Sequence, residues 1–336
     1  MKALVTGGGG FLGGAIVRML LERGDEVVSY SRSRYGALNA LGVRQVSGDL
    51  ADREALAAAA QGCDIIFHVA AKAGIWGDYS EYFHANVTGT GAVIAACRAN
   101  GIQRLVATGS PSVVFDGNDI EGGDESLPYP DHYEAHYPQT KMLAERLVLE
   151  ANSAELATVS LRPHLIWGPG DNHLVPRIIT KARAGRLKRI GSRPCLSDTV
   201  YIDNAAKAHL LAADRLHPGS RIAGKTYFIT NDEPVPLWGM VDRILAAGGL
   251  PPVKGEVSPE VAKLIGTGCE KIWGLLRLSG EPPMTRFVAN ELSTAHWFDI
   301  TAAKRDLGYC PEVSIEEGLR RLREWLPDSG LLPQGR

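Results

Sequence analysis

The segment MKALVTGGGGFLGG, residues 1–14, decides the fold of this chain. Its first part, Ala3 to Thr6, is mostly apolar and predicts a short buried strand, and a run of glycines follows directly. Residues 15–23 then show the apolar spacing of a helix. A glycine motif between a strand and a helix is typical of a loop that binds the phosphates of a dinucleotide.

Gly7, Gly10 and Gly13 repeat at the spacing G-x-x-G-x-x-G. We expect Gly7 to make the tight turn, Gly10 to admit a pyrophosphate close to the backbone and Gly13 to let the helix pack against the strand. Phe11 and Leu12 lie within the motif, where the helix N-terminus would face the phosphates. No Lys-Ser or Lys-Thr pair follows, so the motif is not a Walker A loop. The competing interpretation is a flexible glycine loop, which the preceding buried strand disfavours.

The composition is that of an ordinary globular protein. The chain has 336 residues, of which 45% are hydrophobic and 22% charged, enough for one large or two smaller domains. The net charge of −2 gives no reason to expect a nucleic-acid partner. The 5 cysteines lie far apart without a C-x-x-C pair, which fits a reducing compartment and speaks against a metal site. We expect a cytoplasmic protein without a signal peptide or membrane span, because no uncharged apolar run reaches the roughly 18 residues that a span needs.

The first third of the chain alternates strands and helices, which predicts a Rossmann-type, doubly wound parallel sheet with helices on both faces. The expected strands after the first cover residues 26–30, 43–46, 64–69 and 105–108, and the expected helices cover residues 52–60 and 82–100. We expect residues 1–170 to form the dinucleotide-binding domain and residues 171–336 to form mainly a smaller substrate-binding region. Part of residues 198–235 is expected to return to the main sheet, so that the two regions interleave.

The end of the second strand predicts the choice of cofactor. Folds that bind NAD usually place an acidic residue about 20 residues past the glycines, where it holds the ribose hydroxyls. Here Ser31 and Arg32 follow the strand, so no carboxylate opposes a 2′-phosphate and the guanidinium can pair with one. We therefore expect NADPH rather than NAD. The competing interpretation is that Arg32 is only a solvated surface charge.

Two further strand ends are expected to border the cofactor. Asp49 and Leu50 follow the third strand, where the carboxylate can either bind the adenine amino group or cap the next helix, and both interpretations remain open. Ala70 and Ala71 follow the fourth strand, and their small side chains leave room for the pyrophosphate and ribose. His68, within that strand, is expected to be a core histidine rather than a ligand.

A tyrosine and a lysine stand four residues apart at the start of another expected helix. Tyr137 and Lys141 therefore lie on one helix face, one turn apart. An ammonium group beside a phenol favours the phenolate and lowers a pKa that is normally about 10. Ser110 follows the strand at 105–108 and would hold a carbonyl oxygen. The three side chains together predict a proton relay for carbonyl reduction.

These motifs together resemble those of the short-chain dehydrogenase/reductases, in particular of their extended branch. The glycine motif of that branch is T-G-x-x-G-x-x-G, which residues 6–13 match. Further matching stretches are HVAA (68–71), LRP (161–163), WGPG (167–170) and YIDNAA (201–206). The resemblance therefore covers nearly the whole chain.

The resemblance implies hydride transfer from a nicotinamide, with Tyr137 as the proton donor. It implies that Lys141 holds the nicotinamide ribose and lowers the pKa of the tyrosine, and that Ser110 polarises the carbonyl. Pro163 and His164 would pass beside the nicotinamide, with their backbone against its carboxamide.

One position departs from this family pattern. Gly109 stands where many relatives carry a second Ser or Thr. Ser112 therefore remains a rival to Ser110 for the carbonyl-binding hydroxyl.

Within the branch, residues 110–130 and residues 294–300 resemble the 3β-hydroxysteroid-dehydrogenase-like reductases more than the sugar-nucleotide epimerases. The implied function is NADPH-dependent reduction of a bulky lipophilic ketone, such as a 2-alkyl-3-keto acid of bacterial long-chain olefin biosynthesis. The alternatives are a 3β-hydroxysteroid or sterol dehydrogenase, then a nucleotide-sugar epimerase or dehydratase. A non-catalytic dinucleotide sensor is disfavoured because both the tyrosine and the lysine are present. We also expect a homodimer.

Residues 261–276 show apolar side chains at the helical period and predict an amphipathic helix. Three interpretations of its apolar face remain open: it covers the core, it forms a lid over a channel for alkyl chains, or it docks on a membrane or a partner. A sugar nucleotide would need basic and polar groups for its second pyrophosphate, so this stretch favours a lipophilic substrate. Arg177 and Arg193 are candidates for facing an acidic substrate, with a surface or structural role as the alternative.

Overall fold

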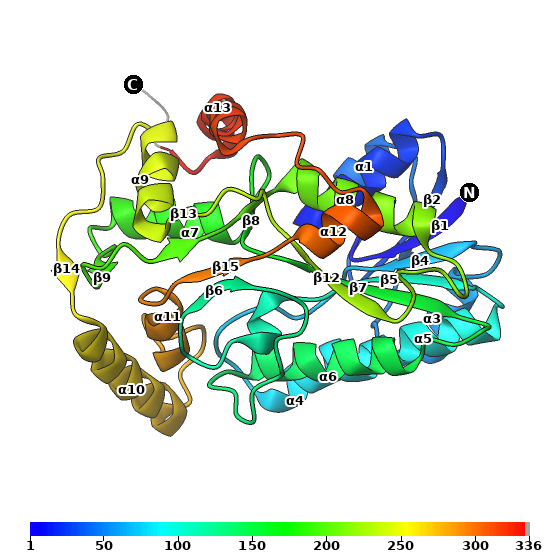
Figure 1. Cartoon of the computed structure of the whole chain (residues 1–336), viewed down its shortest axis with the longest axis horizontal. Helices are drawn as coiled ribbons and strands as arrows, with labels where there is room; N and C mark the ends of the chain where they lie inside the picture. The colour runs from blue at the N-terminus through cyan, green and yellow to red at the C-terminus, as the bar shows by residue number, and fades with distance from the viewer. Residues whose placement is uncertain (333–336) are drawn as a thin grey trace.

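The central sheet of the computed structural model, which describes residues 1–332, has seven parallel strands in the order β3-β2-β1-β4-β5-β7-β12 (Figure 1). The strands are β1 Lys2–Thr6, β2 Glu26–Ser31, β3 Arg44–Ser47, β4 Ile65–His68, β5 Arg104–Thr108, β7 Ala157–Pro163 and β12 Lys225–Ile229. From β1 the chain adds β2 and β3 on one side of the sheet, and it then adds β4, β5, β7 and β12 on the other side. The order of the strands therefore reverses between β1 and β4, and ligands of open α/β sheets bind beside such a point. The expected Rossmann-type fold is confirmed.

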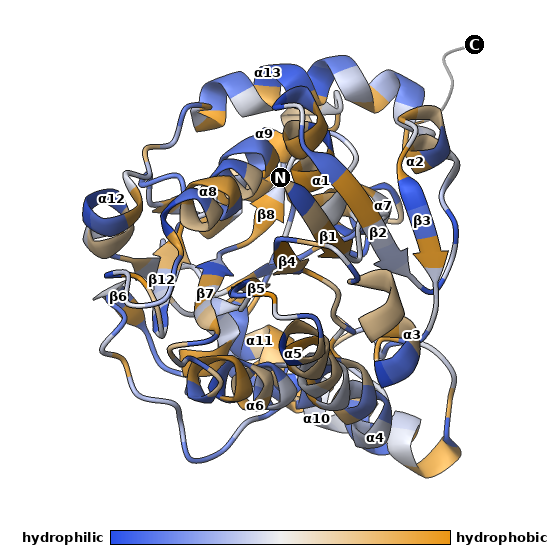
Figure 2. Ribbon diagram, turned by 90° about the vertical axis from the view of Figure 1, so that its right-hand side faces the viewer, coloured by the Kyte–Doolittle hydropathy of each residue, from blue (hydrophilic) through white to orange (hydrophobic). Residues whose placement is uncertain are grey.

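Helices cover both faces of this sheet (Figure 2). On one face α1 (Phe11–Glu22) packs against α8 (Ile202–Arg215), and on the other α3 (Arg53–Ala59), α5 (Gly89–Ala99) and α6 (His136–Glu150) lie side by side. Successive strand residues point to opposite faces, so Ala3 and Val5 of β1 join the core under α1, whereas Leu4 joins the core under α5. Burial on both faces explains why these strands are apolar throughout.

The expected helix at residues 82–100 is interrupted. Helix α4 (Tyr79–Tyr82) leads into a π-helical turn at Phe83–Thr88 before α5 begins. Within this turn Asn86 accepts from the Lys72 backbone N–H at 2.7 Å and donates to its carbonyl at 3.1 Å. Its amide also donates to Thr140 Oγ1 on α6 at 3.0 Å. The wider turn therefore ties the loop after β4 to α6, which a local helical pattern cannot reveal.

A smaller layer lies beyond the carboxyl ends of the central strands (Figure 1). Its four-stranded sheet has the order β13-β10-β15-β6, and two pairs, β8 with β11 and β9 with β14, complete it. These strands are β6 Ile120–Gly123, β8 Ile166–Trp167, β9 Arg189–Ile190, β10 Leu196–Ser197, β11 Val200–Tyr201, β13 Val235–Pro236, β14 Glu256–Val257 and β15 His296–Phe298. The helices are α7 Leu174–Arg183, α9 Leu237–Ala247, α10 Pro259–Leu276, α11 Arg286–Glu291, α12 Thr301–Leu307 and α13 Ile315–Trp325, and the short α2 spans Gly36–Ala40 in the first half.

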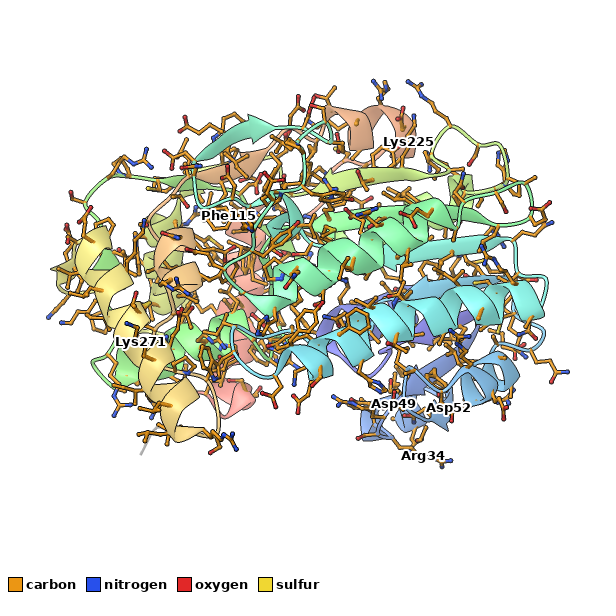
Figure 3. All side chains as sticks on the ribbon, turned by 90° about the horizontal axis from the view of Figure 1, so that it is seen from below. Arg34, Asp49, Asp52, Phe115, Lys225 and Lys271 are labelled. Atoms are coloured by element: carbon orange, nitrogen blue, oxygen red, sulfur yellow. The ribbon has the colours of Figure 1, made fainter. Side chains whose placement is uncertain are left out.

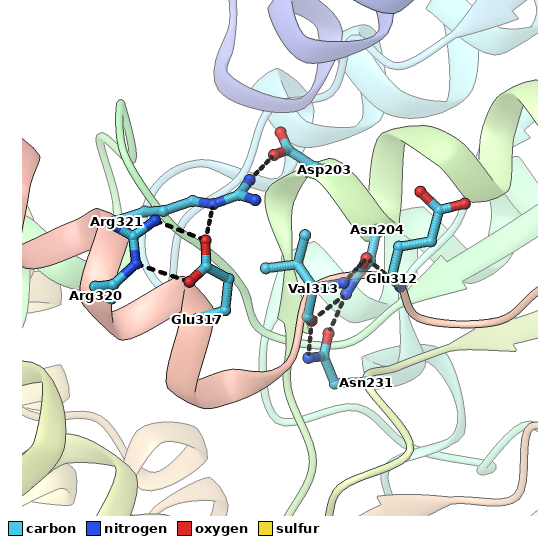
Figure 4. Close-up of polar contacts among 8 residues, drawn as sticks. All are labelled: Asp203, Asn204, Asn231, Glu312, Val313, Glu317, Arg320 and Arg321. Carbon is cyan, nitrogen blue, oxygen red and sulfur yellow. Dashed lines mark hydrogen bonds and ion pairs between the residues drawn. The ribbon is translucent and has the colours of Figure 1, made fainter.

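Buried asparagines fasten the C-terminal segment to the sheet (Figure 4). The Asn204 and Asn231 amides donate to the carbonyl of Val313 at 2.7 and 2.8 Å, and the Val313 N–H donates to Asn204 Oδ1 at 3.0 Å. Asn204 belongs to the YIDNAA stretch, so this stretch has a structural function that joins α8 to the segment before α13. Residues 333–336 of the expected substrate-binding region lie outside the described part of the chain.

The helix expected at 261–276 is present as α10, but its apolar side does not cover the core. The six apolar side chains on that side are 48% to 84% exposed, whereas Ala262 and Gly266 on the other side are buried. The interpretation that this face is core is therefore wrong, because α10 packs through its small residues. Within residues 1–332, no helix combines the length and apolar character that crossing a membrane requires.

Candidate active site

The glycine turn lies at the point where the sheet order reverses. Gly7 adopts φ +72°, and its N–H donates to the carbonyl of Tyr30 at 2.8 Å. A Cβ on Gly7 would lie 3.0 Å from Ala70 Cα, and one on Gly13 would lie 2.2 Å from the Gly7 carbonyl oxygen. Helix α1 begins at Phe11 rather than at the expected residue 15, so its first turn starts inside the motif. The turn therefore has no room for side chains at Gly7 and Gly13, as a phosphate cradle requires.

Two buried hydroxyl groups at the end of β2 lack hydrogen-bond partners among the described residues, Ser29 Oγ and Ser31 Oγ. The next residue, Arg32, is exposed and forms no ion pair within residues 1–332. An unpartnered hydroxyl and a free guanidinium beside a glycine cradle fit the ribose phosphate of a dinucleotide.

Asp49 does not cap the following helix. That position belongs to Asp52, whose carboxylate accepts from the Ala55 N–H at 3.0 Å. Asp49 Oδ1 instead accepts from the Ala51 N–H at 2.8 Å and contacts His84 Nε2 at 3.0 Å. These contacts, the backbone bond above all, lower the pKa of the Asp49 carboxyl. Figure 3 shows Asp49 and Asp52 near one another at one end of the molecule.

The neighbouring predicted residues line the same sheet edge. Leu50 packs against Gly89 at the start of α5, where a Cβ would lie 2.7 Å from the leucine side chain. Thr6 Oγ1 accepts from the N–H of Val69 at 3.1 Å and of Ala70 at 3.2 Å, which joins the ends of β1 and β4. His68 in β4 has both ring nitrogens bonded to threonine hydroxyls at 2.9 Å, and burial lowers its pKa to about 3. It is a core histidine, as expected.

Ser110, Tyr137 and Lys141 come together at the end of β5. A hydrogen bond with Ser110 lowers the pKa of Tyr137, while burial of the phenol raises it more strongly. Lys141 Nζ donates to the carbonyl of Thr108, the last residue of β5, at 2.6 Å. Burial lowers the pKa of Lys141 to about 8. Ser112 Oγ lies 2.8 Å from Ser110 Oγ, so the hydroxyl of Ser112 is hydrogen-bonded to the hydroxyl of Ser110.

The expected lowering of the Tyr137 pKa by Lys141 is not what the structure shows. The ammonium group is bound to Thr108, and removal of water from the phenol is the largest influence on its pKa, which is raised. Tyr137 is therefore held in its protonated form. A protonated phenol is the state that a proton donor needs.

The absence of a second hydroxyl at position 109 has a steric cause. A Cβ on Gly109 would lie 2.7 Å from Ser160 Oγ and 2.8 Å from Glu145 Oε2. Glu145 in turn binds the buried Arg162, with Oε1 accepting from Nη2 at 2.6 Å. The buried ion pair occupies the space that a side chain at position 109 would need.

Sequence reasoning missed a buried pair beside the end of β7. His164 Nδ1 lies 2.6 Å from Asp198 Oδ1, and Asp198 Oδ2 accepts from the Phe298 N–H at 2.8 Å. The His164 N–H donates to the carbonyl of Ile229 in β12 at 3.1 Å. The two partners stand 34 residues apart in the chain, and no local pattern connects them.

Glu291, at the end of α11, was also missed. Its carboxyl group is desolvated, which raises its pKa to about 7, and the neighbouring His164 acts in the opposite direction. The charge of Glu291 in turn raises the pKa of Tyr137, so the two groups face one site. His296 Nε2 lies 2.6 Å from the Glu291 carbonyl, which positions the end of α11 against β15. A titratable carboxyl beside the phenol makes Glu291 part of the candidate site.

Arg177 and Arg193 hold loops together. Arg177 pairs with Glu281, and Arg193 pairs with Asp119. These ion pairs agree with the alternative that both arginines have a structural role, rather than with binding of an acidic substrate. A cavity of about 300 Å³ is lined among others by Tyr82, His136, Glu270 and Arg286, and so includes the residue that precedes Tyr137 in the chain. A larger cavity of about 500 Å³, lined among others by Lys225, lies between β12 and α12 at the other side of the molecule.

Comparison with known proteins shows the family to which the sequence is similar. Residues 4–255 match the 3-beta hydroxysteroid dehydrogenase/isomerase family. A 2-alkyl-3-oxoalkanoate reductase of Stenotrophomonas maltophilia is 54% identical over 325 residues, which cover 96% of this chain and 98% of that protein. A protein of the same name from Shewanella oneidensis is 51% identical, over 96% and 85% of the two chains. The decarboxylating sterol-4-alpha-carboxylate 3-dehydrogenase of Mus musculus is 35% identical, over 95% and 89%.

Solved structures share the fold over nearly the whole chain. The crystal structure of gox2253 has a TM-score of 0.80 at 25% identity, covering 98% of this chain and 99% of that one. The structure of MoeE5 in complex with UDP-glucose and NAD has a TM-score of 0.75 at 24% identity, with the same coverage.

Proposed function

The chain belongs to the 3-beta hydroxysteroid dehydrogenase/isomerase family, and on that premise we propose that it reduces the ketone of 2-alkyl-3-oxoalkanoates with NADPH. The product is the 2-alkyl-3-hydroxyalkanoate. The observation that carries the proposal is the convergence of Ser110, Tyr137 and Lys141 at the end of β5, two strands away in the sheet from β1 and its glycine turn. Identity of 54% with a reductase of that name supports the substrate class.

NADPH supplies the hydride when it is bound. The residues that would hold it, from the adenine end to the nicotinamide end, are Asp49, Leu50, Ser31, Arg32, Gly7, Gly10, Phe11, Leu12, Gly13, Ala70, Ala71, Tyr137, Lys141, Pro163 and His164. A nicotinamide dinucleotide is supported by the NAD complex of the structural neighbour MoeE5. The preference for the phosphorylated form rests on Arg32 and on the unpartnered hydroxyl of Ser31.

The residues of the site handle the proton. The hydroxyls of Ser110 and Tyr137 donate to the ketone oxygen and hold it in place. Because burial keeps the phenol protonated, Tyr137 can pass its proton to that oxygen as the alcohol forms. Lys141, fixed by the Thr108 carbonyl, places a cation one helical turn from the phenol and stabilises the charge that develops there.

The names of two relatives describe related chemistry. A 3-oxoalkanoate and a 3-hydroxysterol with a 4-carboxylate both carry the carboxylate on the carbon next to the reacting one. A β-keto acid is therefore common to both names, as the substrate of the reductase and as the oxidised form that the dehydrogenase makes. A sterol dehydrogenase is the second candidate, supported by the 35% identity with the mouse protein.

The test measures NADPH oxidation by the purified protein against a panel of ketones. The panel contains 2-alkyl-3-oxo acids of several chain lengths, a 3-oxosteroid, a sterol acid and a UDP-sugar, and mass spectrometry identifies the products. We expect the highest kcat/KM for the 2-alkyl-3-oxo acids, with 3-hydroxy acid as product. A higher kcat/KM for the steroid or sterol would contradict the proposal in favour of the second candidate.

A further inference from the structure

The side chain of His164 is held in one orientation beside the end of β7. Its ring lies against those of His296 and Phe298, at centroid distances of 5.4 and 5.3 Å and edge-on to both. Nδ1 is bound to Asp198 Oδ1 at 2.6 Å. The other ring nitrogen, Nε2, takes part in no hydrogen bond within residues 1–332, and 11% of the side chain is exposed. Nε2 is therefore free to meet a ligand.

The backbone around His164 is fixed as well. Leu165 adopts φ +42°, in the left-handed region that a bulky side chain seldom adopts. The Leu165 carbonyl accepts from the Val200 N–H at 3.4 Å, and the His164 N–H donates to the Ile229 carbonyl at 3.1 Å. Unusual backbone conformations of this kind occur mainly at functional sites, where the surrounding structure maintains them. Leu165 therefore marks the end of β7 as a place where a side chain is aimed.

Asp198 stabilises a positive charge on the ring. Its side chain is 1% exposed, and within the described part of the chain it forms an ion pair with His164 alone. Its second oxygen accepts from the backbone N–H of Phe298 at 2.8 Å, and this donor is uncharged. A buried carboxylate is costly unless a cation is paired with it. Asp198 therefore favours the imidazolium form of His164, in which Nε2–H is a charged donor.

His164 lies beside the groups that are proposed to hold the ketone oxygen. Thr108 is paired with Leu161 in the register of β5 with β7, so Ser110 comes level with Pro163, the residue before His164. Neighbouring strands lie about 4.8 Å apart. In a 3-oxo acid, one carbon separates the ketone from the carboxylate. A substrate whose ketone is bound at Ser110 can therefore bring its carboxylate to the adjacent strand end.

Glu291 connects His164 with the phenol of Tyr137. The charge of His164 acts on the Glu291 carboxyl, and the charge of Glu291 acts on Tyr137, so the three groups border one site. Burial raises the pKa of Glu291 to about 7. A carboxyl that keeps its proton up to this range repels an anionic substrate less than an ordinary glutamate would. Glu291 is therefore compatible with a carboxylate bound next to it.

The other cations considered for an acidic substrate already have partners. Arg177 and Arg193 each form an ion pair with a carboxylate of another segment. The ammonium group of Lys141 donates to a backbone carbonyl. Nε2 of His164, by contrast, has no partner among the described residues. His164 is therefore the best placed of these side chains to bind an anion at the end of β7.

We propose that Nε2–H of His164 binds the carboxylate of the substrate, and that Asp198 positions the charged ring. His164 is then the residue that distinguishes a 3-oxo acid from a ketone without a carboxyl group. The assignment concerns the side chain, so the backbone of His164 remains available to the nicotinamide. It rests on the proposed function and identifies the part of the site that recognises the acid.

The experiment compares a 2-alkyl-3-oxo acid with the ketone that remains when its carboxyl group is removed. The measured quantity is the ratio of the two kcat/KM values with NADPH, acid over ketone. Changes in cofactor binding or in the amount of folded protein affect both substrates and cancel in this ratio. We expect a ratio of at least about 10 in the wild type, the low end for a hydrogen bond to a charged group.

His164→Asn and His164→Gln form a matched pair. The amide nitrogen of Asn can take the position of Nδ1 and keep the bond to Asp198, but no atom remains at Nε2. The amide nitrogen of Gln can take the position of Nε2, while the bond to Asp198 is lost. We expect the ratio to fall to about 1 in His164→Asn and to stay several-fold higher in His164→Gln. His173→Gln is the control, because His173 is an exposed histidine at the start of α7 and should leave the ratio unchanged.

Asp198→Asn tests the positioning role independently of any change at His164. Asn keeps an oxygen for the Phe298 N–H but lacks the charge that stabilises the imidazolium. We expect the KM of the acid to rise several-fold while kcat is retained, so that the ratio falls. A merely structural role of Asp198 would change the kinetics of both substrates equally. If thermal melts show that His164→Asn does not fold, Asp198→Asn decides the result.

Two outcomes would overturn the assignment. One is a ratio near 1 in the wild type. The other is a ratio that His164→Asn or Asp198→Asn leaves unchanged, and weaker NADPH binding in such a variant would assign the side chain to the cofactor instead. The proposed function fails separately, through absence of turnover of both substrates by the wild type. Calorimetric dissociation constants of the acid and the ketone, measured with NADP⁺ present, then give the same ratio for binding alone.

Discussion

The glycine turn and α10 are both glycine-containing segments with clear sequence patterns, and they end in opposite environments. In the turn, Gly7 and Gly13 are enclosed by backbone atoms, and a Cβ would find no room. In α10, Gly268 and Gly274 have nothing within 4 Å of the position of a Cβ. The glycines of the turn are therefore required by contacts, whereas these two glycines of α10 are not. Glycine is thus needed for close packing in the turn but not at these two positions of α10, and substitutions by alanine can measure this difference.

The largest effect is expected on turnover, when the phenol hydroxyl of Tyr137 is removed. Tyr137→Phe removes the proton donor and keeps the ring, so kcat should fall at least about 100-fold while NADPH still binds. Turnover and cofactor fluorescence titration measure the two quantities. Tyr79→Phe is the control, because it removes an exposed hydroxyl near the same site and should leave kcat unchanged. Near-normal turnover of Tyr137→Phe would show that another group donates the proton.

The cofactor preference should be the next largest effect. We expect NADPH to bind more tightly than NADH by about 1.5–3 kcal/mol, the range for hydrogen bonds to charged groups. Ser31→Asp combined with Arg32→Ala should reverse the preference, since it replaces a cation by a carboxylate. Dissociation constants for both cofactors test this. Equal affinities in the wild type would refute the assignment.

Substitution of Gly13 tests how tightly the glycine turn is packed. Gly13→Ala should lower the free energy of unfolding by about 1–3 kcal/mol and weaken cofactor binding, because its Cβ would lie 2.2 Å from the Gly7 carbonyl oxygen. Gly14→Ala is the matched control one residue away, where the nearest atom lies at 3.5 Å. Denaturant unfolding of both variants measures the difference. Equal stability of the two would mean that the turn can relax around a side chain.

The titration of Glu291 is expected to make stability depend on pH. Its folded pKa of about 7 exceeds the ordinary value of 4.5, so the folded state holds the proton more tightly. The stabilisation is complete below pH 4.5 and is lost as the pH rises to about 7. As the pH rises through this range, the free energy of unfolding of Glu291→Gln should therefore increase by about 1–2 kcal/mol relative to that of the wild type. This value allows for the partial exposure of the side chain. Thermal melts from pH 4.5 to 8 test it, and a difference between the two chains that does not vary with pH would contradict it.

The smallest effect is expected on α10. Gly268→Ala and Gly274→Ala should each stabilise the chain by up to about 1 kcal/mol, because alanine favours the helix and meets no neighbouring atom. Gly266→Ala should instead destabilise it, since its Cβ would lie 2.6 Å from Thr285. Urea unfolding distinguishes these results. If Gly268→Ala were as harmful as Gly266→Ala, the exposed side of α10 would be covered in solution.

Much of the site was accessible from sequence because its signals are local. The glycine spacing, the strand before it and the alternation of strands and helices predict the sheet, since neighbouring residues decide a turn or a helix face. The spacing of Tyr137 and Lys141 likewise places both on one side of α6, and the position of Ser110 at a strand end places it in the same region. The homodimer and the cytoplasmic location stay predictions.

Other features depend on residues that are distant in the chain. The contact of His164 with Asp198 spans 34 residues. The carboxyl of Glu291 acts on Tyr137, and these two residues are 154 positions apart in the chain (291 − 137). The raised pKa of Tyr137 follows from its burial, which outweighs the local effect expected of Lys141. No pattern within one segment reports how much water surrounds a side chain.

By itself, the sequence determined the fold class, the family and the positions of the candidate proton relay, because these follow from short-range spacing. It also determined that residues 261–276 form a helix with one apolar side. Only the tertiary structure decided that this side faces solvent, since Ala262 and Gly266 supply a small surface through which the helix packs against Thr285 and Arg286. The physical reason is that periodicity defines which residues share a side, whereas burial depends on which distant segment comes to cover it.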